Sequence, residues 1–364
     1  MSEQKITILG AGAWGTAIAT LLAHNDHHVT LWCHEPEITY EITKQHTNSQ
    51  YLPDITLSPK INATTNLEEA ITGASLIFEA IPVKFLRQII EQVLATDPTC
   101  RHPRLACPSC FDKLSMSTHP AVPGEASREA WEPVEGRAPS WVILSKGIEQ
   151  KTRLLPSQII QDVLKAPINY AVLGGPSFAK ELADRQFTTA TIASTNSKLI
   201  TQLDTLLNNN YFKTFPSQDP IGTQICGAIK NVFALIIGIA YGSGHKENTA
   251  SYLITQGLRE IAYLIKHLGG DPQTAYGLSG LGDLILSCTG TLGKNLKAGR
   301  LLAQDRSIEN LSLNFKTLPE GLNTLLSLRE LIERDNLHMP LCHAAYKFIF
   351  QNEPFSIFLD QKQR

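Results

Sequence analysis

A lysine and an aspartate each stand alone as the single charge in an apolar stretch of this chain. Lys230 is the only charged residue in residues 220–244, and Asp283 is the only one between residues 271 and 294. Lysine and aspartate are almost never fully buried without a partner, so these two are predicted to pair. Burial and a second cation lower the pKa of a lysine, which then exchanges a proton near neutral pH. The alternatives are a lysine that extends to solvent and an aspartate that caps a helix.

Other cations are placed where an anionic substrate would bind. Lys146 follows the apolar run Trp141–Leu144, and ligands of doubly wound sheets bind beyond the carboxyl ends of strands. Lys294, Lys297 and Arg300 form a basic cluster at the start of a predicted helix and suit a phosphate group. For both features the alternative is a solvated basic surface.

A glycine motif predicts a dinucleotide cofactor. Gly10-Ala11-Gly12-Ala13-Trp14-Gly15 follows the strand pattern Ile6–Leu9 and opens the helical pattern Thr16–His24. The first glycine of such a motif permits a tight turn, the second lets a pyrophosphate approach the backbone, and the third lets the helix pack on the strand. The helix N-terminus attracts the phosphates. The motif therefore predicts NAD or NADP.

The end of the second predicted strand leaves the choice between the two cofactors open. An acid that binds the ribose hydroxyl usually stands there, but this chain has Trp32 and Cys33 instead. His34 could face a 2′-phosphate or lie exposed in a loop, while Glu35 could reach a hydroxyl. Further along, Gly174–Glu181 joins a strand to a helix that Ser177 is predicted to cap, with backbone N–H groups free for ligand oxygens.

The sequence predicts two domains that position these motifs: an α/β domain comes first, and an all-helical domain follows it. Seven strand patterns alternate with amphipathic stretches, which predicts a doubly wound parallel sheet of the Rossmann type; they are Ile6–Leu9, Val29–Cys33, Leu76–Ala80, Trp141–Leu144, Tyr170–Leu173, Thr189–Ala193 and Phe212–Phe215. After these strands the sequence pattern predicts helices at Thr223–Tyr241, Ala250–Leu268, Asn295–Ala303, Leu322–Arg334 and Pro340–Phe350. We expect a dinucleotide-binding domain at residues 1–217 and a helical substrate and catalytic domain at 218–364.

Residues 95–140 do not fit this alternation. They contain seven prolines and no sustained periodicity, where a connection of about 2–6 residues is usual. We expect a loose or disordered insertion, which resembles a translated palindromic repeat of the kind found in some bacterial genes. Its cysteines and histidines (Cys100, His102, Cys107, Cys110 and His119) include a single C-x-x-C, so no metal site is predicted.

Composition excludes several classes of protein. The 364 residues carry a net charge of −2, so no basic surface indicates nucleic acid. The apolar stretch around Lys230 is predicted to be a buried helix rather than a membrane span, since a central lysine would be costly in lipid. The N-terminus lacks a secretory pattern and the cysteines lack disulfide spacing, which favours a cytoplasmic protein.

The motifs together resemble the bacterial NAD(P)-dependent glycerol-3-phosphate dehydrogenases, in the family's order and over nearly the whole chain. The motifs that carry the resemblance are Gly10–Gly15, Ser145–Glu149, Gly175–Ser177, Lys230–Val232, Gly280–Leu284 and Pro319–Gly321. The resemblance implies an oxidoreductase that interconverts dihydroxyacetone phosphate and sn-glycerol 3-phosphate for phospholipid synthesis, and that is cytoplasmic and usually dimeric. The alternatives are a related 3-hydroxyacid dehydrogenase and a non-catalytic NAD(P)-binding protein disabled by the insertion.

The resemblance also implies a role for individual residues. Catalysis is assigned to Lys230, Asp283 and Lys146. Contacts to the cofactor are assigned to Gly10, Gly12, Ala13, Trp14, Gly15, His34, Tyr51, Lys146, Ala179, Lys294 and Glu320. Contacts to the substrate are assigned to Lys146, Gly175, Ser177, Lys230, Asp283, Gly293, Lys294 and Asn295. The family has arginine where this chain has Lys294, and often serine where it has Gly293, so the affinity for the phosphate is expected to differ.

Overall fold

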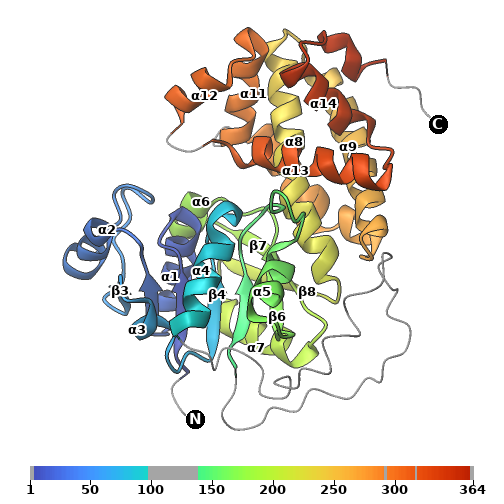
Figure 1. Ribbon diagram of the computed structural model, residues 1–364. Helices are drawn as coiled ribbons and strands as arrows, with labels where there is room; N and C mark the ends of the chain where they lie inside the picture. The colour runs from blue at the N-terminus through green and yellow to red at the C-terminus, as the bar shows by residue number, and fades with distance from the viewer. Residues whose placement is uncertain (1–3, 97–137, 291–292, 316–317, 361–364) are drawn as a thin grey trace, which may run out of the picture.

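The structure is a computed structural model that describes residues 4–96, 138–290, 293–315 and 318–360. An α/β part formed by the first half of the chain lies beside a helical part formed by the second (Figure 1). The predicted insertion at residues 95–140 falls outside the described residues except at its two ends, and so do its cysteines and histidines.

The α/β part is built on a single eight-stranded sheet. The strand order is β3-β2-β1-β4-β5-β6-β7-β8, with the strands at Ile6–Leu9 (β1), Val29–Trp32 (β2), Ile61–Thr64 (β3), Leu76–Glu79 (β4), Ser140–Ile143 (β5), Tyr170–Gly174 (β6), Thr188–Ala193 (β7) and Phe212–Ser217 (β8). Two strand predictions were wrong. The edge strand β3 was missed, and β7 runs antiparallel to β6, so the sheet is not wholly parallel.

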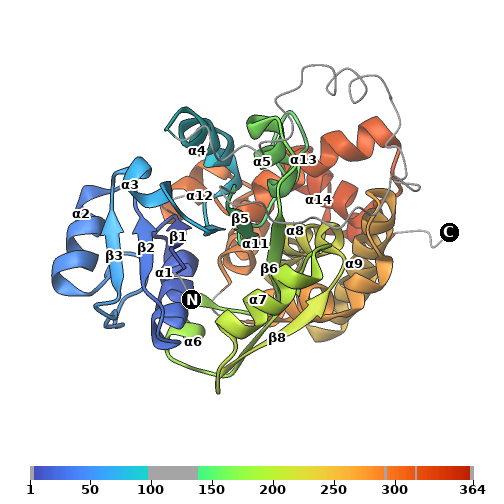
Figure 2. The same cartoon turned by 90° about the horizontal axis from the view of Figure 1, so that it is seen from below.

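Helices cover both faces of this sheet, as a doubly wound fold requires (Figures 1 and 2). Their bounds are Ala13–His24 (α1), Pro36–Tyr40 (α2), Leu67–Ile71 (α3), Val83–Thr96 (α4), Pro156–Leu164 (α5), Ala179–Ala183 (α6) and Ser197–Leu207 (α7), with a π-helical turn η1 at Glu41–Gln45. Alternate strand residues face opposite sides. Ile8 and Phe78 pack with α1 and α7 on one face, while Ile77 and Trp141 pack with α4 and α5 on the other. The predicted fold class is confirmed.

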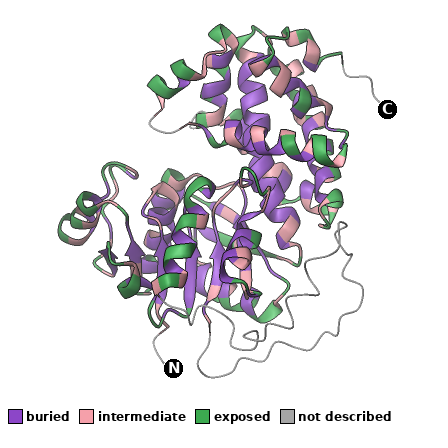
Figure 3. Cartoon of the chain, viewed as in Figure 1, coloured by how far each residue is buried: buried purple, intermediate pink, exposed green. Residues whose placement is uncertain are grey.

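The helical part is organised around α8, Pro220–Gly242. The other helices are Glu247–His267 (α9), Asp283–Thr289 (α10), Lys294–Asp305 (α11), Ile308–Asn314 (α12), Glu320–Asp335 (α13) and Pro340–Phe350 (α14), with short turns η5 at Pro272–Tyr276, η6 at Leu278–Gly282 and η7 at Phe355–Phe358. By length and composition α8 would be long and apolar enough to cross a membrane, but 89% of its apolar window is buried inside the protein. Figure 3 shows it buried along its length at the centre of this part, so α8 is a core helix.

The strand register brings the carboxyl ends of the central strands into one row. Leu9 of β1 is paired with Trp32 of β2 and with Glu79 of β4, and Glu79 is paired in turn with Ile143 of β5. Residues that follow these four positions therefore meet at one edge of the sheet. The glycine motif, Glu35 and Lys146 all come from that edge.

Candidate active site

The glycine turn after β1 leaves open space where the sequence predicts phosphates. Gly10 has φ +113° and a Cβ there would lie 2.7 Å from the Ala80 oxygen, so the turn requires glycine. A Cβ on Gly12 would meet nothing within 4 Å. Gly12 is the N-cap of α1 and has no side chain that could bind the first-turn N–H groups. These free donors and the open space above them fit the pyrophosphate of a dinucleotide.

Three charged side chains from distant parts of the chain meet at one point. Lys230 lies in the middle of α8, Asp283 is the first residue of α10, and Lys146 follows β5. Oδ1 of Asp283 accepts a hydrogen bond from Nζ of Lys230, and its Oδ2 accepts one from Nζ of Lys146 at 2.8 Å. Asp283 is 1% exposed. The predicted pairing of Lys230 with Asp283 is present, and Lys146 completes a three-membered cluster.

Burial lowers the pKa of the Lys230 ammonium from its ordinary value. The Asp283 carboxylate opposes this shift, while the positive charge of Lys146 adds to the lowering. The sequence predicted a lowered pKa from burial and a second cation, and both causes are found. A lysine of this kind releases and regains its proton more readily than an exposed one.

A hydrogen-bonded network of neutral and acidic groups lies beside this cluster. Nδ2 of Asn231 donates to Oε2 of Glu320 at 3.4 Å, and Nδ2 of Asn295 donates to Oδ1 of Asn231 at 3.0 Å. Oδ1 of Asn295 accepts the Gly321 N–H at 2.9 Å. A Cβ on Gly321 would lie 2.4 Å from the Asn231 oxygen, so only glycine lets α13 begin this close to α8. The network fixes the start of α13, and with it Glu320, against α8.

Burial raises the pKa of the Glu320 carboxyl, and four lysines in its surroundings act in the opposite direction. They are Lys146, Lys230, Lys294 and Lys84. Positive charge from α4, α8, α11 and the loop after β5 is thus directed at one buried region. Such a region is suited to an anionic ligand.

A cavity of about 280 Å³ opens onto the cluster and the glycine turn. Its lining residues come from both parts of the chain: Ala13, Trp14, Ala80, Ile81, Pro82, Leu144, Ser145, Lys146, Ser177, Ala179, Lys230, Asn231 and Glu320. The indole Nε1 of Trp14 is buried and has no hydrogen-bond partner among the described residues. Trp14 lines the cavity, so a bound ligand that shifts the indole slightly could supply the acceptor that this donor lacks.

Other residues that the sequence singled out lie around the cavity rather than in its lining. Gly10, Gly12 and Gly15 form the turn at its edge, Asp283 lies behind the two lysines, and Gly293 precedes α11. Lys294 is exposed and has no ion pair within the described part of the chain. The guanidinium of Arg300 lies over the Tyr241 ring, 5.3 Å from its centroid, and therefore has a structural contact of its own.

His34 and Tyr51 lie at the carboxyl edge of the sheet, beyond the end of β2, and neither lines the cavity that contains the lysines. His34 is exposed, with its ring centroid 6.4 Å from that of Trp32. The Tyr51 hydroxyl donates to Oε1 of Glu35 at 2.8 Å.

The prediction that Ser177 caps the following helix was wrong. The helix α6 begins after Phe178, which has no side-chain cap. The Ser177 hydroxyl instead donates to the Gly175 carbonyl oxygen at 3.1 Å, because the chain turns sharply at Gly175, whose φ is +151°. Ser177 still lines the cavity, so it remains available to a ligand.

Sequence reasoning missed Glu79, the last residue of β4. Its Oε2 accepts the Ser145 hydroxyl at 2.6 Å and its Oε1 accepts the Ile81 N–H at 2.7 Å. Complete burial raises the pKa of Glu79 to about 7, although both hydrogen bonds act to lower it. The signal was the single acid in the apolar run Leu76–Ala80. Glu79 ties the ends of β4 and β5 together directly beside Lys146.

Comparisons with known proteins agree along both parts of the chain. Residues 5–102 and 116–200 match the family described as NAD-dependent glycerol-3-phosphate dehydrogenase N-terminus, and residues 219–360 match the corresponding C-terminus. A glycerol-3-phosphate dehydrogenase [NAD(P)+] of Bacillus cereus (strain B4264) is 34% identical over 350 residues, which cover 95% of this chain and 91% of the relative. The relative of the same name from Bacillus cytotoxicus is 34% identical over 351 residues, covering 96% and 92%.

A solved structure shows the same arrangement. The crystal structure of glycerol-3-phosphate dehydrogenase from Coxiella burnetii superposes with a TM-score of 0.83 at 26% identity, and the superposition covers 99% of both chains.

Proposed function

The chain belongs to the NAD-dependent glycerol-3-phosphate dehydrogenase family, and from this premise we propose that Lys230, Asp283 and Lys146 form its catalytic centre. The protein is an NAD(P)-dependent oxidoreductase that interconverts dihydroxyacetone phosphate and sn-glycerol 3-phosphate. The observation that carries the assignment is the pair of lysines on one buried carboxylate at the cavity.

Lys230 acts as the proton donor when the ketone is reduced. The bound nicotinamide supplies the hydride that the carbonyl carbon gains. As negative charge develops on the carbonyl oxygen, the Lys230 ammonium gives that oxygen a proton and becomes neutral. In the reverse direction the neutral amine removes the proton from the hydroxyl. A pKa lowered by burial suits both directions.

Lys146 and Asp283 support this transfer in different ways. The Lys146 ammonium adds positive charge next to the developing alkoxide, and such preorganised charge is strongest where water is excluded. The Asp283 carboxylate binds both ammonium groups and fixes their separation. It therefore positions the lysines and keeps their two positive charges together in a buried site.

The phosphate of the substrate is assigned to the start of α11. Gly293, Lys294 and Asn295 begin this helix, and the N-terminal N–H groups of a helix attract anions. Lys294 adds a charge that no described acidic side chain neutralises by an ion pair. Ser177, which lines the cavity, and Gly175, two residues before it, are assigned to the substrate as well.

The cofactor is assigned to the carboxyl edge of the sheet. Gly10, Gly12 and Gly15 would hold its pyrophosphate, and Ala13, Trp14, Ala179 and Glu320 line the adjoining cavity. His34 and Tyr51 lie toward the adenosine end. We assign residues 1–217 to the dinucleotide-binding domain and 218–364 to the substrate domain, which the separate family matches on either side of residue 217 support.

The cellular setting is part of the same proposal. The resemblance of the motifs to bacterial glycerol-3-phosphate dehydrogenases supports a cytoplasmic homodimer that supplies glycerol 3-phosphate to phospholipid synthesis.

The test is a substrate comparison in the steady state. The purified protein should reduce dihydroxyacetone phosphate with NADH or NADPH with a kcat/KM at least about tenfold above that for dihydroxyacetone, since charged hydrogen bonds to the phosphate are lost with the latter. Equal values for the two ketones would contradict the proposal. Faster oxidation of a 3-hydroxyacid would favour that class of dehydrogenase, and cofactor binding without turnover would favour a non-catalytic protein.

A further inference from the structure

The carboxylate of Glu35 folds back to the end of β2. Glu35 comes three residues after Trp32, the last residue of that strand. Its Oε2 nevertheless lies 3.4 Å from Sγ of Cys33, the residue that directly follows the strand. A carboxylate is thus brought to the strand end, where dinucleotide-binding sheets place an acid for the ribose hydroxyls.

Tyr51 and Cys33 hold this carboxylate in place. The Tyr51 hydroxyl donates to Oε1 at 2.8 Å. The Cys33 thiol lies 3.4 Å from Oε2 and also 3.4 Å from the Glu35 carbonyl oxygen, so these two acceptors share its single proton. Burial raises the pKa of the Cys33 thiol to about 11, and burial raises the pKa of Tyr51 as well. Both groups are therefore neutral donors near neutral pH. A carboxylate accepts about four hydrogen bonds, so two lone pairs of Glu35 remain for a ligand.

The loop that carries Tyr51 is anchored on the glycine turn. Asn48 is completely buried, and its Nδ2 donates to the Ala11 oxygen and to Oγ1 of Thr16, each at 2.9 Å. The Tyr51 N–H in turn donates to Oδ1 of Asn48 at 3.3 Å. The Glu35 carboxylate is therefore fixed relative to the turn that would bind the pyrophosphate, and the adenosine ribose adjoins that pyrophosphate.

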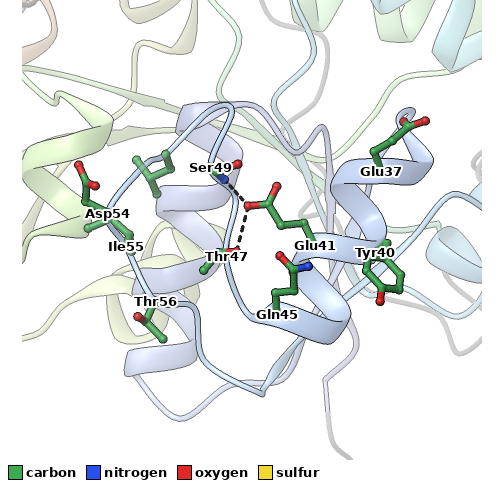
Figure 4. Close-up of a pocket in the computed structure, with 10 residues that line it drawn as sticks. Glu37, Tyr40, Glu41, Gln45, Thr47, Ser49, Asp54, Ile55 and Thr56 are labelled. Atoms are coloured by element: carbon green, nitrogen blue, oxygen red, sulfur yellow. Dashed lines mark hydrogen bonds between the residues drawn. The ribbon is translucent and has the colours of Figure 1, made fainter.

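The segments that follow Glu35 also enclose a cavity, which Glu35 itself does not line. A cavity of about 610 Å³ lies between α2, η1 and the loop at residues 46–56 (Figure 4). Among the described residues its lining includes Glu37, Glu41 and Asp54 but no lysine, arginine or histidine, although the Lys180 ammonium lies 3.8 Å from the Asp54 carboxylate. Figure 4 shows that the Glu41 carboxylate binds the Thr47 hydroxyl and the Ser49 N–H, at 2.9 and 2.6 Å, which orders this loop.

No ion pair to Glu35 is found in the part of the chain that the structure describes. Its negative charge is therefore not cancelled by a neighbouring cation. A 2′-phosphate placed here would meet a fixed carboxylate, and like charges at close range are unfavourable.

We propose that Glu35, positioned by Tyr51 and Cys33, binds the adenosine ribose hydroxyls and makes this enzyme prefer NADH to NADPH. This inference rests on the proposed function, which identifies the cofactor as a nicotinamide dinucleotide. It adds that Glu35 determines whether NADH or NADPH binds more tightly. Glu35 accepts hydrogen bonds from the 2′- and 3′-hydroxyls and repels a 2′-phosphate.

The first test uses fragments of the cofactor, so that it does not depend on turnover. Binding of AMP and of adenosine 2′,5′-bisphosphate to the full-length protein is measured by calorimetry. Wild type should bind AMP more tightly. The Glu35→Gln variant should shift the ratio of the two affinities toward the bisphosphate by about tenfold or more, as expected for loss of a charged hydrogen bond and a repulsion. Equal or tighter binding of the bisphosphate by wild type overturns the proposal.

The second test uses variants around Glu35, with kcat/KM measured for NADH and NADPH. Tyr51→Phe should also reduce the preference for NADH, but by less than Glu35→Gln does, because the carboxylate remains and loses only the hydrogen bond from the Tyr51 hydroxyl. Glu37→Gln is the matched control: it removes an exposed acid two residues away that touches neither Cys33 nor Tyr51, and it should leave the ratio nearly unchanged. If Glu37→Gln changed the ratio of the kcat/KM values for NADH and NADPH as much as Glu35→Gln does, the specific role of Glu35 would be overturned. Absence of turnover with both cofactors would count against the proposed function and not against this inference.

Discussion

Lys146 donates a hydrogen bond of 2.8 Å to Asp283, and this contact joins the carboxyl edge of the sheet to the helical part. Lys146 follows β5, whereas Asp283 begins α10 beyond the core helix α8. The same carboxylate binds Lys230. The cluster proposed to be catalytic is therefore assembled only when the two parts are packed together, and residues from both parts line the cavity between them.

The pH dependence of the two reaction directions should have opposite signs. Burial lowers the pKa of Lys230, so kcat for oxidation of glycerol 3-phosphate should rise with pH through a midpoint below the ordinary lysine value of about 10.4. Reduction requires the ammonium and should fall through the same range. Asp283→Asn should move the midpoint lower still, because burial and Lys146 would then act unopposed. A midpoint at or above the ordinary value would show that another group titrates.

Lys294 should contribute to substrate affinity as a point charge. Lys294→Ala should raise KM for dihydroxyacetone phosphate by about tenfold or more if a charged hydrogen bond is lost. Lys294→Arg should lower KM, since a guanidinium binds a phosphate through two parallel hydrogen bonds. Kinetics at two salt concentrations would show the effect, with Lys266→Ala, an exposed lysine of α9 outside this basic cluster, as the control. An unchanged KM in Lys294→Ala would mean that another cation binds the phosphate.

Glu79 should position the Ser145–Lys146 segment without contacting the substrate. Glu79→Leu leaves the Ser145 hydroxyl and the Ile81 N–H without their acceptor, and we expect kcat to fall by roughly tenfold to a hundredfold as Lys146 shifts. Glu79→Gln is isosteric, mimics the protonated form that the raised pKa makes accessible near neutral pH, and should retain most of the activity. Thermal melting separates misfolding from mispositioning. If a folded Glu79→Leu variant had the same kcat as wild type, the Ser145–Lys146 segment would be positioned without Glu79.

Isolated charges and glycine spacing made much of the site predictable from sequence. Lys230 and Asp283 stood out because a single charge in an apolar run must find a partner. Glu79 satisfied the same rule but was taken only as a strand residue, since its partner Ser145 lies 66 positions away. The contacts of Asn231 and Asn295 were not visible either, because helix packing alone brings these polar residues together.

The errors in the fold have equally local causes. The edge strand β3 contains only four residues and exposes Asn62, so its apolar signal is weak. The direction of β7 depends on how the chain returns after α6, and alternation of apolar residues is the same for parallel and antiparallel strands. The insertion was predicted from the length of the interval between α4 and β5. The expectation that it is loose or disordered concerns residues that lie almost entirely outside the described part of the chain.

The proton-donor role of Lys230 is tested most directly by Lys230→Ala. We predict that this variant binds NADH nearly as well as wild type, because the contacts of Lys230 are assigned to the substrate and not to the cofactor. Its kcat for dihydroxyacetone phosphate should fall by at least about 10²–10⁴-fold, since both a positioned acid and its charge are removed. The measurement is single-turnover reduction with the binding of NADH titrated in parallel. A folded Lys230→Ala protein that keeps more than about a tenth of the wild-type rate would contradict the account.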